Sequence, residues 1–188
     1  SGIAGLTAAL HAHELGHRVT LVTKGSLGDG CTGLAQGGVA GVYGRGDSPA
    51  HHASDTIAAG AGLSDPEAVE VLVSDGAARI AELIARGVAF DRSPEGDLLL
   101  GREAAHSHAR IVHAGGDATG SAISLALIAH VRRSGIAVVQ HAFLLDLVVR
   151  RHGAGGRDTA RGIRVLIDDL ETVIDADSVI LATGGAGQ

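Results

Sequence analysis

Apolar residues recur at helical spacing in the first segment of the chain, and a short run rich in β-branched and aliphatic residues follows it. The helical spacing runs from Ile3 to Leu15 and stops at Gly16, and the second run extends from Arg18 to Thr23. A helix that leads into a strand over this distance is the second half of a βαβ unit. We therefore expect an α/β arrangement in the N-terminal part of the chain.

Further along, capping residues and glycines mark three more predicted helices. Ser48 followed by Pro49 is typical of a helix start, as is the segment Ser64–Glu67. Before these helices, residues 25–46 contain nine glycines, a density that predicts a loop and excludes a regular helix. The expected helices cover residues 48–60, 64–87 and 119–134.

The remaining β-rich segments predict a mixture of parallel and antiparallel strands. Turns are expected at 93–96 and 153–156. Strands of both kinds beside a βαβ unit are typical of an α/β, Rossmann-like two-dinucleotide-binding domain with a mixed sheet. The predicted strands cover residues 88–91, 97–100, 136–140, 143–151, 161–168 and 172–182, the last of them broken near 175–177.

Composition and charge exclude several classes of function. A net charge of −6 with dispersed arginines argues against a nucleic-acid partner, and a single cysteine cannot form an internal disulfide. No apolar run reaches the roughly 20 residues of a membrane span, and no signal peptide opens the chain. We expect a cytoplasmic protein with a small-molecule ligand and no membrane insertion. Because the chain opens at Ser1 and stops at Gln188 inside a glycine turn, we expect a fragment truncated at both ends.

The first chemically informative motif is Ser1–Leu6, which would complete G-x-G-x-x-G if a glycine preceded it. Gly2 would let the backbone approach a pyrophosphate, Gly5 would let the helix pack closely on the sheet, and the helix N-terminus attracts an anion. An incidental glycine-rich helix start is the alternative. Thr23-Lys24 replaces the acidic residue that binds ribose in many such folds, and a basic residue there also suits the 2′-phosphate of NADP.

A second motif, CTGLAQGG at Cys31–Gly38, follows the predicted strand. Its small residues let backbone N–H groups come within hydrogen-bond range of a cofactor's pyrophosphate and ring edge. Together with the helix start, this loop favours a flavin site over a nicotinamide site, and therefore a redox enzyme. An NADP-binding module remains the competing interpretation.

In their order and spacing, these motifs resemble the L-aspartate oxidase branch of the succinate dehydrogenase and fumarate reductase flavoprotein family. The resemblance covers nearly the whole chain and rests on SGIAGL, TKG, CTGLAQGGVAG, DTIAAGAG, GREAAHSHARIVH, DATG and ATGGAG. It implies that residues 1–188 are a partial FAD-binding domain, with a substrate-capping domain and a helical domain further along the parent chain. The fragment alone is then expected to be inactive.

The same resemblance implies which residues contact FAD. Cys31 stands where covalently flavinylated members of the family place a histidine, which implies dissociable, non-covalent FAD. A small residue tolerated in a tight loop is the plainer interpretation of this cysteine. The residues implied at FAD are Ser1, Gly2, Ile3, Ala4, Gly5, Lys24, Cys31, Thr32, Gly33, Leu34, Ala35, Gln36, Gly37, Gly38, Thr183 and Gly184.

Glu103 is the candidate for substrate recognition, because the resemblance places it opposite the amino group of the substrate. A carboxylate there would discriminate L-aspartate from succinate through a charge-assisted hydrogen bond. Without the resemblance, a solvated loop ion pair with Arg102 is the simpler interpretation.

Histidines cluster in two segments of the chain. His106, His108 and His113 have a spacing that could converge on zinc, but no further firm ligand accompanies them, so we expect no metal. A polar loop that hydrogen-bonds substrate or flavin is the interpretation we favour for them. The adjacent pair His51-His52 is expected on a solvated face.

For the activity, the resemblance implies FAD-dependent oxidation of L-aspartate to iminoaspartate, on the quinolinate route of NAD biosynthesis. Oxygen or fumarate would reoxidise the flavin, and quinolinate synthase is a candidate partner. One alternative is a succinate dehydrogenase or fumarate reductase flavoprotein subunit bound to an iron–sulfur partner, and another is a non-catalytic NAD(P)-binding module. Cys31 and Glu103 separate the first two possibilities, and a bound flavin chromophore would exclude the third.

Overall fold

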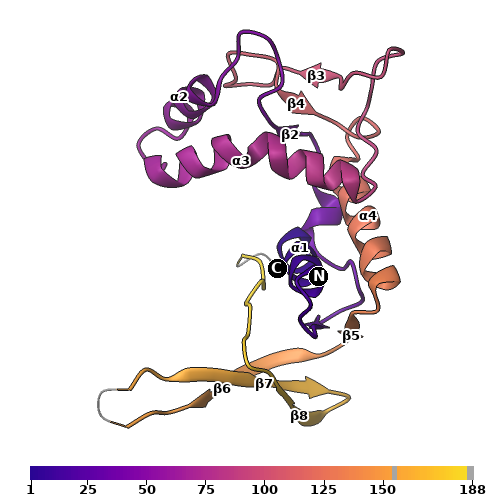
Figure 1. Cartoon of the computed structure of the whole chain (residues 1–188), viewed down its shortest axis with the longest axis vertical. Helices are drawn as coiled ribbons and strands as arrows, with labels where there is room; N and C mark the ends of the chain where they lie inside the picture. Colours follow the sequence, from indigo (N-terminus) through magenta and orange to yellow (C-terminus); the bar gives the residue numbers. More distant parts are fainter. Residues whose placement is uncertain (154–155, 186–188) are drawn as a thin grey trace. The chain divides into compact units, whose positions relative to one another are not determined.

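The computed structural model describes residues 1–153 and 156–185, and the chain divides into two compact units (Figure 1). The first unit joins Ser1–Thr32 to Leu127–Gln188, and the second comprises Gly33–Ala126. Helices occur with one parallel strand pair and two antiparallel sheets, which confirms the predicted α/β class with both kinds of strand pairing.

In the first unit, one helix and one strand form the start of the chain as the sequence predicts. Helix α1 (Ile3–Glu14) leads into strand β1 (Thr20–Val22), which pairs in parallel with β5 (Ala137–Val139). The last part of helix α4 (Thr119–Ser134) precedes β5, and Gly135, with a φ of 79°, follows the helix as expected.

The core of this unit forms where α1 approaches β1. Leu6 and Leu10 on α1 are 0% and 1% exposed. A Cβ at Gly5 would lie 3.5 Å from the Cβ of Ala182 and 3.9 Å from Cδ1 of Leu21, which is ordinary van der Waals contact. The helix therefore packs on Ala182 and Leu21 at a distance that would also admit a Cβ, and the packing does not require glycine at position 5.

The first unit also contains an antiparallel sheet in the order β6-β7-β8. Its strands are β6 (Phe143–Arg150), β7 (Thr159–Ile167) and β8 (Leu170–Asp175), drawn as a long ribbon in Figure 1. The turn expected at 153–156 lies partly outside the described residues. The strand expected to continue to residue 182 is wrong beyond Asp175. The Ala176 N–H still bonds to the Arg161 carbonyl in β7 at 2.9 Å, but residues 177–182 form no strand, and Ile180 is 68% exposed.

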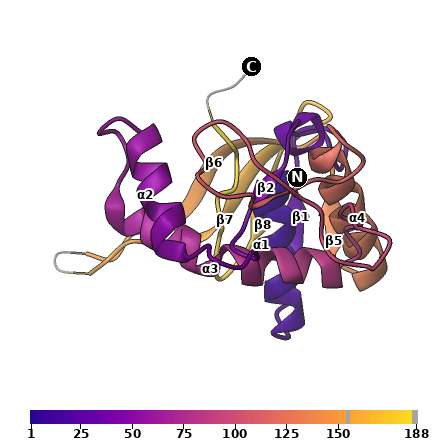
Figure 2. The same cartoon turned by 90° about the horizontal axis from the view of Figure 1, so that it is seen from above.

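In the second unit, two helices begin at the predicted caps. They are α2 (Pro49–Ala59) and α3 (Pro66–Ala85), which lie side by side in both views (Figures 1 and 2). The Ser48 hydroxyl accepts the N–H of His51 at 3.1 Å, and the Asp65 carboxylate caps α3. Because each cap is followed by a proline at the first helical position, both starts are defined locally.

A small antiparallel sheet in the order β2-β4-β3 completes this unit. Its strands, β2 (Val39–Ala40), β4 (Ile111–Val112) and β3 (Leu100–Gly101), are two residues each, and the sequence pattern does not predict β2 or β4. The strands expected at 88–91 and 97–100 are wrong over most of their length, since only an isolated bridge joins Arg92 to Leu98. The glycine-rich loop also contains a short 3₁₀ turn, η1 (Cys31–Leu34).

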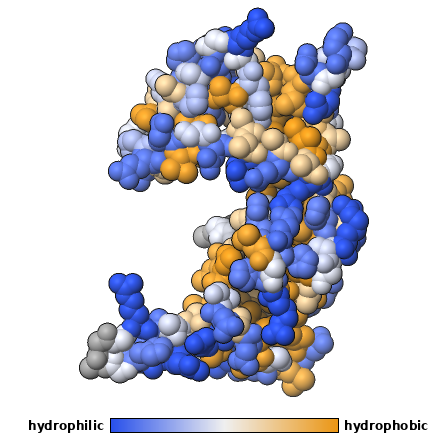
Figure 3. Space-filling model, in the orientation of Figure 1, coloured by the Kyte–Doolittle hydropathy of each residue, from blue (hydrophilic) through white to orange (hydrophobic). Residues whose placement is uncertain are grey.

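Apolar and polar residues are interspersed on the visible face of each unit (Figure 3). On α3, for example, Val73 and Ile80 are each 2% exposed, whereas Val71 and Leu72 face outward. Among the described residues, no helix combines the length and the apolar character that crossing a membrane requires.

Candidate functional site

The N-terminal residue of the first unit ties the start of α1 to the loop that follows β1. Ser1 Oγ accepts hydrogen bonds from Thr23 Oγ1 at 3.1 Å and from the Gly28 N–H at 3.2 Å, and it donates to the Ser26 carbonyl at 3.5 Å. Two of the predicted nucleotide-binding segments, the glycine motif and the loop containing Lys24, therefore lie together. Lys24 itself is exposed.

The first turn of α1 is capped by a side chain that is distant in the sequence. The Ile3 N–H donates to Thr32 Oγ1 at 2.9 Å, while the amides of Ala4 and Gly5 have no acceptor within residues 1–153 and 156–185. A Cβ at Gly2 would lie 3.3 Å from the same Thr32 oxygen, so the backbone is tightly approached there. Free amides at a helix N-terminus attract an anion such as a phosphate group.

The predicted loop residues of the second unit are largely exposed to solvent. Leu34 is 84% exposed, Ala35 and Gln36 are exposed, and Gly37 adopts a φ of 71° that favours glycine. The Ala35 carbonyl accepts the N–H of Gly120 at 3.2 Å, which fixes the loop against the start of α4. Thr183 and Gly184, predicted near the flavin, are exposed in the first unit, and Gly184 has a φ of 79°.

Glu103 does not pair with its neighbour in sequence. Arg102 Nε instead donates to the His106 carbonyl at 2.9 Å. The Glu103 carboxylate accepts a hydrogen bond from His113 Nε2 at 2.8 Å, and 49% of its side chain is exposed. The structure thus separates Glu103 from Arg102 and joins it to a histidine that the sequence analysis had placed in another cluster.

A buried ionic network in the second unit is centred on Arg110, between His106 and His113 in the sequence. Arg110 is fully buried and binds Asp47 through two hydrogen bonds, of 2.8 Å from Nε and 2.7 Å from Nη2. Its Nη1 donates to Asp55 at 2.7 Å, and Asp55 also accepts two hydrogen bonds from Ser107. The sequence analysis missed Arg110, although an arginine between apolar residues was the available signal.

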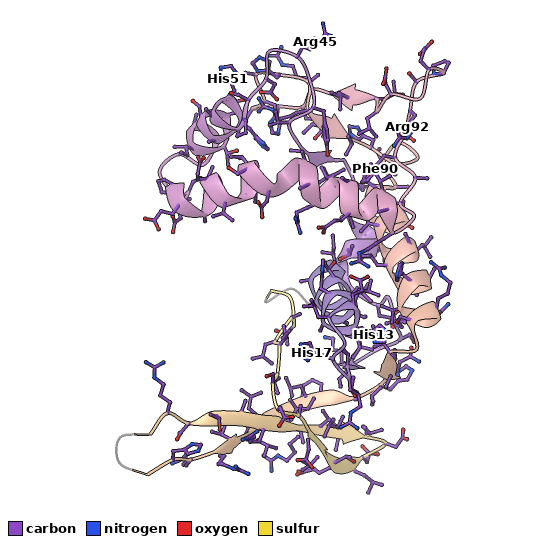
Figure 4. The ribbon with its side chains drawn as sticks, viewed as in Figure 1. His13, His17, Arg45, His51, Phe90 and Arg92 are labelled. Carbon is purple, nitrogen blue, oxygen red and sulfur yellow. The ribbon has the colours of Figure 1, made fainter. Side chains whose placement is uncertain are left out.

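His51 and His52, both expected on a solvated face, differ in their exposure. His52 is only 3% exposed, and its Nδ1 has no partner among the described residues, so the expectation was wrong for His52. Burial, followed by the positive charge of Arg110, lowers the pKa of His52, which keeps the ring neutral. His51 is about half exposed and stacks on His108, and Figure 4 shows it on α2.

His106, His108 and His113, whose spacing could have converged on zinc, do not meet in the structure. His113 pairs with Glu103, while His51 and His108 place a nitrogen near Asp47, all within 4.8 Å of one another. Arg110 already binds both oxygens of that aspartate. A guanidinium 2.7 Å from the only carboxylate makes this group a poor site for a dication.

The carboxylates of this network predict how stability depends on pH. The hydrogen bond from Arg110 is the main cause that lowers the pKa of Asp47, and the Ser107 hydrogen bonds lower that of Asp55. Because both folded pKa values lie below those of the unfolded chain, this stabilisation is fully present above about pH 4 and is lost as the pH falls through the folded values. The free energy of unfolding, measured with urea between pH 7 and pH 3, is expected to stay constant at the higher pH values and to decrease only below about pH 4. An Asp47→Asn variant with an unchanged acid decrease would contradict this.

Comparisons with known proteins agree in pointing to one family. A family model described as "FAD binding domain" matches residues 1–188. The chain is 48% identical over its whole length to L-aspartate oxidase of Streptomyces coelicolor and 44% identical to that of Caulobacter vibrioides, and it covers 32% and 36% of these proteins. It therefore spans about a third of the length of these curated relatives.

Solved structures give the same fold. The Sdh1 complex of Mycobacterium smegmatis in the apo form matches 98% of the chain with a TM-score of 0.86 and 28% identity, and the match covers 33% of that chain. Quinol fumarate reductase FrdA of E. coli matches 99% of the chain with a TM-score of 0.89 and 28% identity, and the match covers 32% of that chain.

Proposed function

The chain belongs to the FAD binding domain family, and on that premise we propose that it is the FAD-binding part of an enzyme that oxidises L-aspartate to iminoaspartate. The observation that carries the proposal is the 40–48% identity, over the whole chain, to proteins named L-aspartate oxidase. Supporting it, the structure has an exposed carboxylate beside the glycine loop, where an amino group could be recognised.

The residues present fit FAD at two places, each within one unit. In the first unit, Gly2 lets Thr32 Oγ1 come close to the start of α1, and the amides of Ala4 and Gly5, without an acceptor in the described part of the chain, could bind a phosphate oxygen. In the second unit, the exposed loop around Gln36 presents its backbone to a ring edge. When bound, FAD supplies the acceptor for the hydride that leaves the substrate Cα.

Within this proposal, the role of Glu103 is to recognise the substrate ammonium. Its carboxylate is half exposed, and His113 holds one oxygen while the other remains available. A charge-assisted hydrogen bond to an ammonium is worth about 1.5–3 kcal/mol. Succinate, which lacks the amino group, gains nothing from it, so the carboxylate selects the amino acid.

The reduced flavin must pass its two electrons to a second acceptor before the next turnover, and we propose oxygen or fumarate for this role. The product iminoaspartate would enter NAD biosynthesis, with quinolinate synthase as the partner that consumes it, in the cytoplasm. The second candidate function is that of a succinate dehydrogenase or fumarate reductase subunit, which the TM-scores of 0.86 and 0.89 support. Glu103 favours the oxidase, because a subunit that acts on succinate has no use for an ammonium-binding carboxylate.

Substrate preference tests the proposed function. The complete flavin-loaded protein is expected to form hydrogen peroxide in air with L-aspartate and to do so far more slowly with succinate. Peroxide is measured with a coupled peroxidase assay at matched flavin concentration. Rapid dye reduction by succinate with no reaction of L-aspartate would favour the second candidate and overturn the first.

Cys31 provides a test of how the cofactor is held. Because Cys31 is an exposed free thiol in a short 3₁₀ turn, and no histidine stands at this position, we propose non-covalent FAD. Acid precipitation of the purified holoenzyme is expected to release all of the flavin into the supernatant. Cys31→Ser should retain the same flavin content, and flavin that stays with the washed precipitate would contradict the proposal.

A further inference from the structure

The ring of His113 lies beside two glycines, Gly38 just before β2 and Gly101 on β3. His113 follows β4, the central strand of the β2-β4-β3 sheet, directly. A Cβ at Gly38 would lie 3.0 Å from Cδ2 of His113 and 2.5 Å from the Val112 carbonyl oxygen. A Cβ at Gly101 would lie 2.9 Å from Cε1 of the same ring. A side chain at Gly101 would press directly on the imidazole, whereas one at Gly38 would first meet Cγ2 of Ile111 and the Val112 carbonyl oxygen.

The backbone of His113 is fixed as well. Its carbonyl accepts the N–H of Asp91 at 2.8 Å, and the Asp91 carboxylate accepts the N–H groups of Gly115 and Gly116 at 3.0 and 3.4 Å. The imidazole therefore projects from an anchored main chain.

From this position, His113 holds one end of the Glu103 carboxylate. The distance from Nε2 to Oε1 is 2.8 Å, and because a carboxylate can only accept, Nε2 carries the hydrogen. The other oxygen, Oε2, lies 4.0 Å from the Cβ position of Gly37, so the carboxylate faces the glycine loop. The Glu103 carboxylate has no other hydrogen-bond or ion-pair partner among the described residues, and the Glu103 backbone carbonyl accepts the N–H of His106 at 3.0 Å.

We propose that His113 is a positioning residue, which holds the Glu103 carboxylate against the Gly37-Gly38 loop so that its open oxygen meets the substrate ammonium. The inference rests on the proposed function of Glu103. The hydrogen bond from Nε2 fixes the half-exposed Glu103 side chain before substrate arrives, so less conformational entropy is lost when the substrate binds. His113 thereby contributes to the selection of amino-substituted dicarboxylates without contacting them.

The test compares two substitutions in the complete flavin-loaded enzyme. His113→Phe keeps a ring but removes the donor, and it is expected to lower kcat/KM for L-aspartate roughly tenfold, the effect of one lost hydrogen bond to a charged group. Fumarate reduction by a reduced dye, which needs no ammonium, is expected to change less than about threefold by the same reasoning. His113→Gln, whose amide can donate at a similar reach, should recover most of the L-aspartate activity.

A double-mutant cycle with Glu103→Gln separates positioning from a general structural effect. If His113 acts through Glu103, then His113→Phe causes little further loss once Glu103 is already Gln. His17→Phe, an exposed histidine after α1, serves as the matched control, and rates are expressed per bound flavin so that only folded holoenzyme is counted.

Four results would contradict these proposals. Equal losses for L-aspartate and fumarate, or an undiminished effect of His113→Phe in the Glu103→Gln background, would overturn the role of His113. If His113→Phe does not fold, a His113→Gln enzyme with the substrate preference of Glu103→Gln would overturn it as well. A wild-type enzyme that does not oxidise L-aspartate would instead overturn the proposed function from which the inference starts.

Discussion

Glu103→Gln in the complete enzyme is expected to lower kcat/KM for L-aspartate by roughly 10- to 100-fold, the equivalent of about 1.5–3 kcal/mol. The neutral amide has almost the same shape, but it offers an ammonium no negative charge. Fumarate reduction is expected to change by less than about threefold, because fumarate has no amino group for Glu103 to bind. Steady-state kinetics with both substrates on the same preparation measures the ratio.

The matched control for this prediction is Glu70→Gln, at an exposed glutamate on α3. It removes the same charge from the protein surface and should leave both activities unchanged. If Glu103→Gln reduced the two activities by the same factor, then Glu103 would be a general determinant of the active site and not a selector of the amino group.

Arg110→Met is expected to lower the free energy of unfolding by about 3–5 kcal/mol, the largest stability effect we predict. Methionine fills a similar volume, but Asp47, whose side chain is 1% exposed, then loses both hydrogen bonds from the guanidinium. A buried carboxylate without its partner must be desolvated or protonated at a large cost. Urea unfolding at pH 7 gives the measurement.

Two further variants show whether the loss of stability is specific to the Arg110 network. Arg164→Met removes an arginine that is 47% exposed and pairs with Glu171 at 3.5 Å, and it should cost less than about 1 kcal/mol. Adding Asp47→Asn to Arg110→Met should recover part of the lost stability, because no buried charge is then left unpaired. An Arg110→Met protein as stable as Arg164→Met would contradict the account of the network.

Features defined by local interactions could be predicted from the sequence. The caps at Ser48 and Asp65 and the helix end before Gly135 depend on residues within one turn of each other, and all are present. The strands expected at 88–91 and beyond Asp175 are absent because strand formation depends on residues far away in the sequence. A strand requires a partner, and the pattern of a segment does not say whether one lies beside it.

The same limit applies to the candidate site. Sequence neighbours suggested Arg102 as the partner of Glu103, whereas the partner is His113, ten positions away and brought close by β3 and β4. His52 is buried because Arg110 and His106, more than fifty residues further along, approach it. The residue types at the site were visible in the sequence, but their pairing required the fold.

The most direct test of the central claim is the visible absorption spectrum of the complete purified protein before and after anaerobic addition of L-aspartate. We predict a flavin spectrum, present on purification or restored by added FAD, that L-aspartate bleaches and oxygen brings back. A colourless protein that takes up no added FAD would contradict the assignment of this chain as a flavin-binding domain.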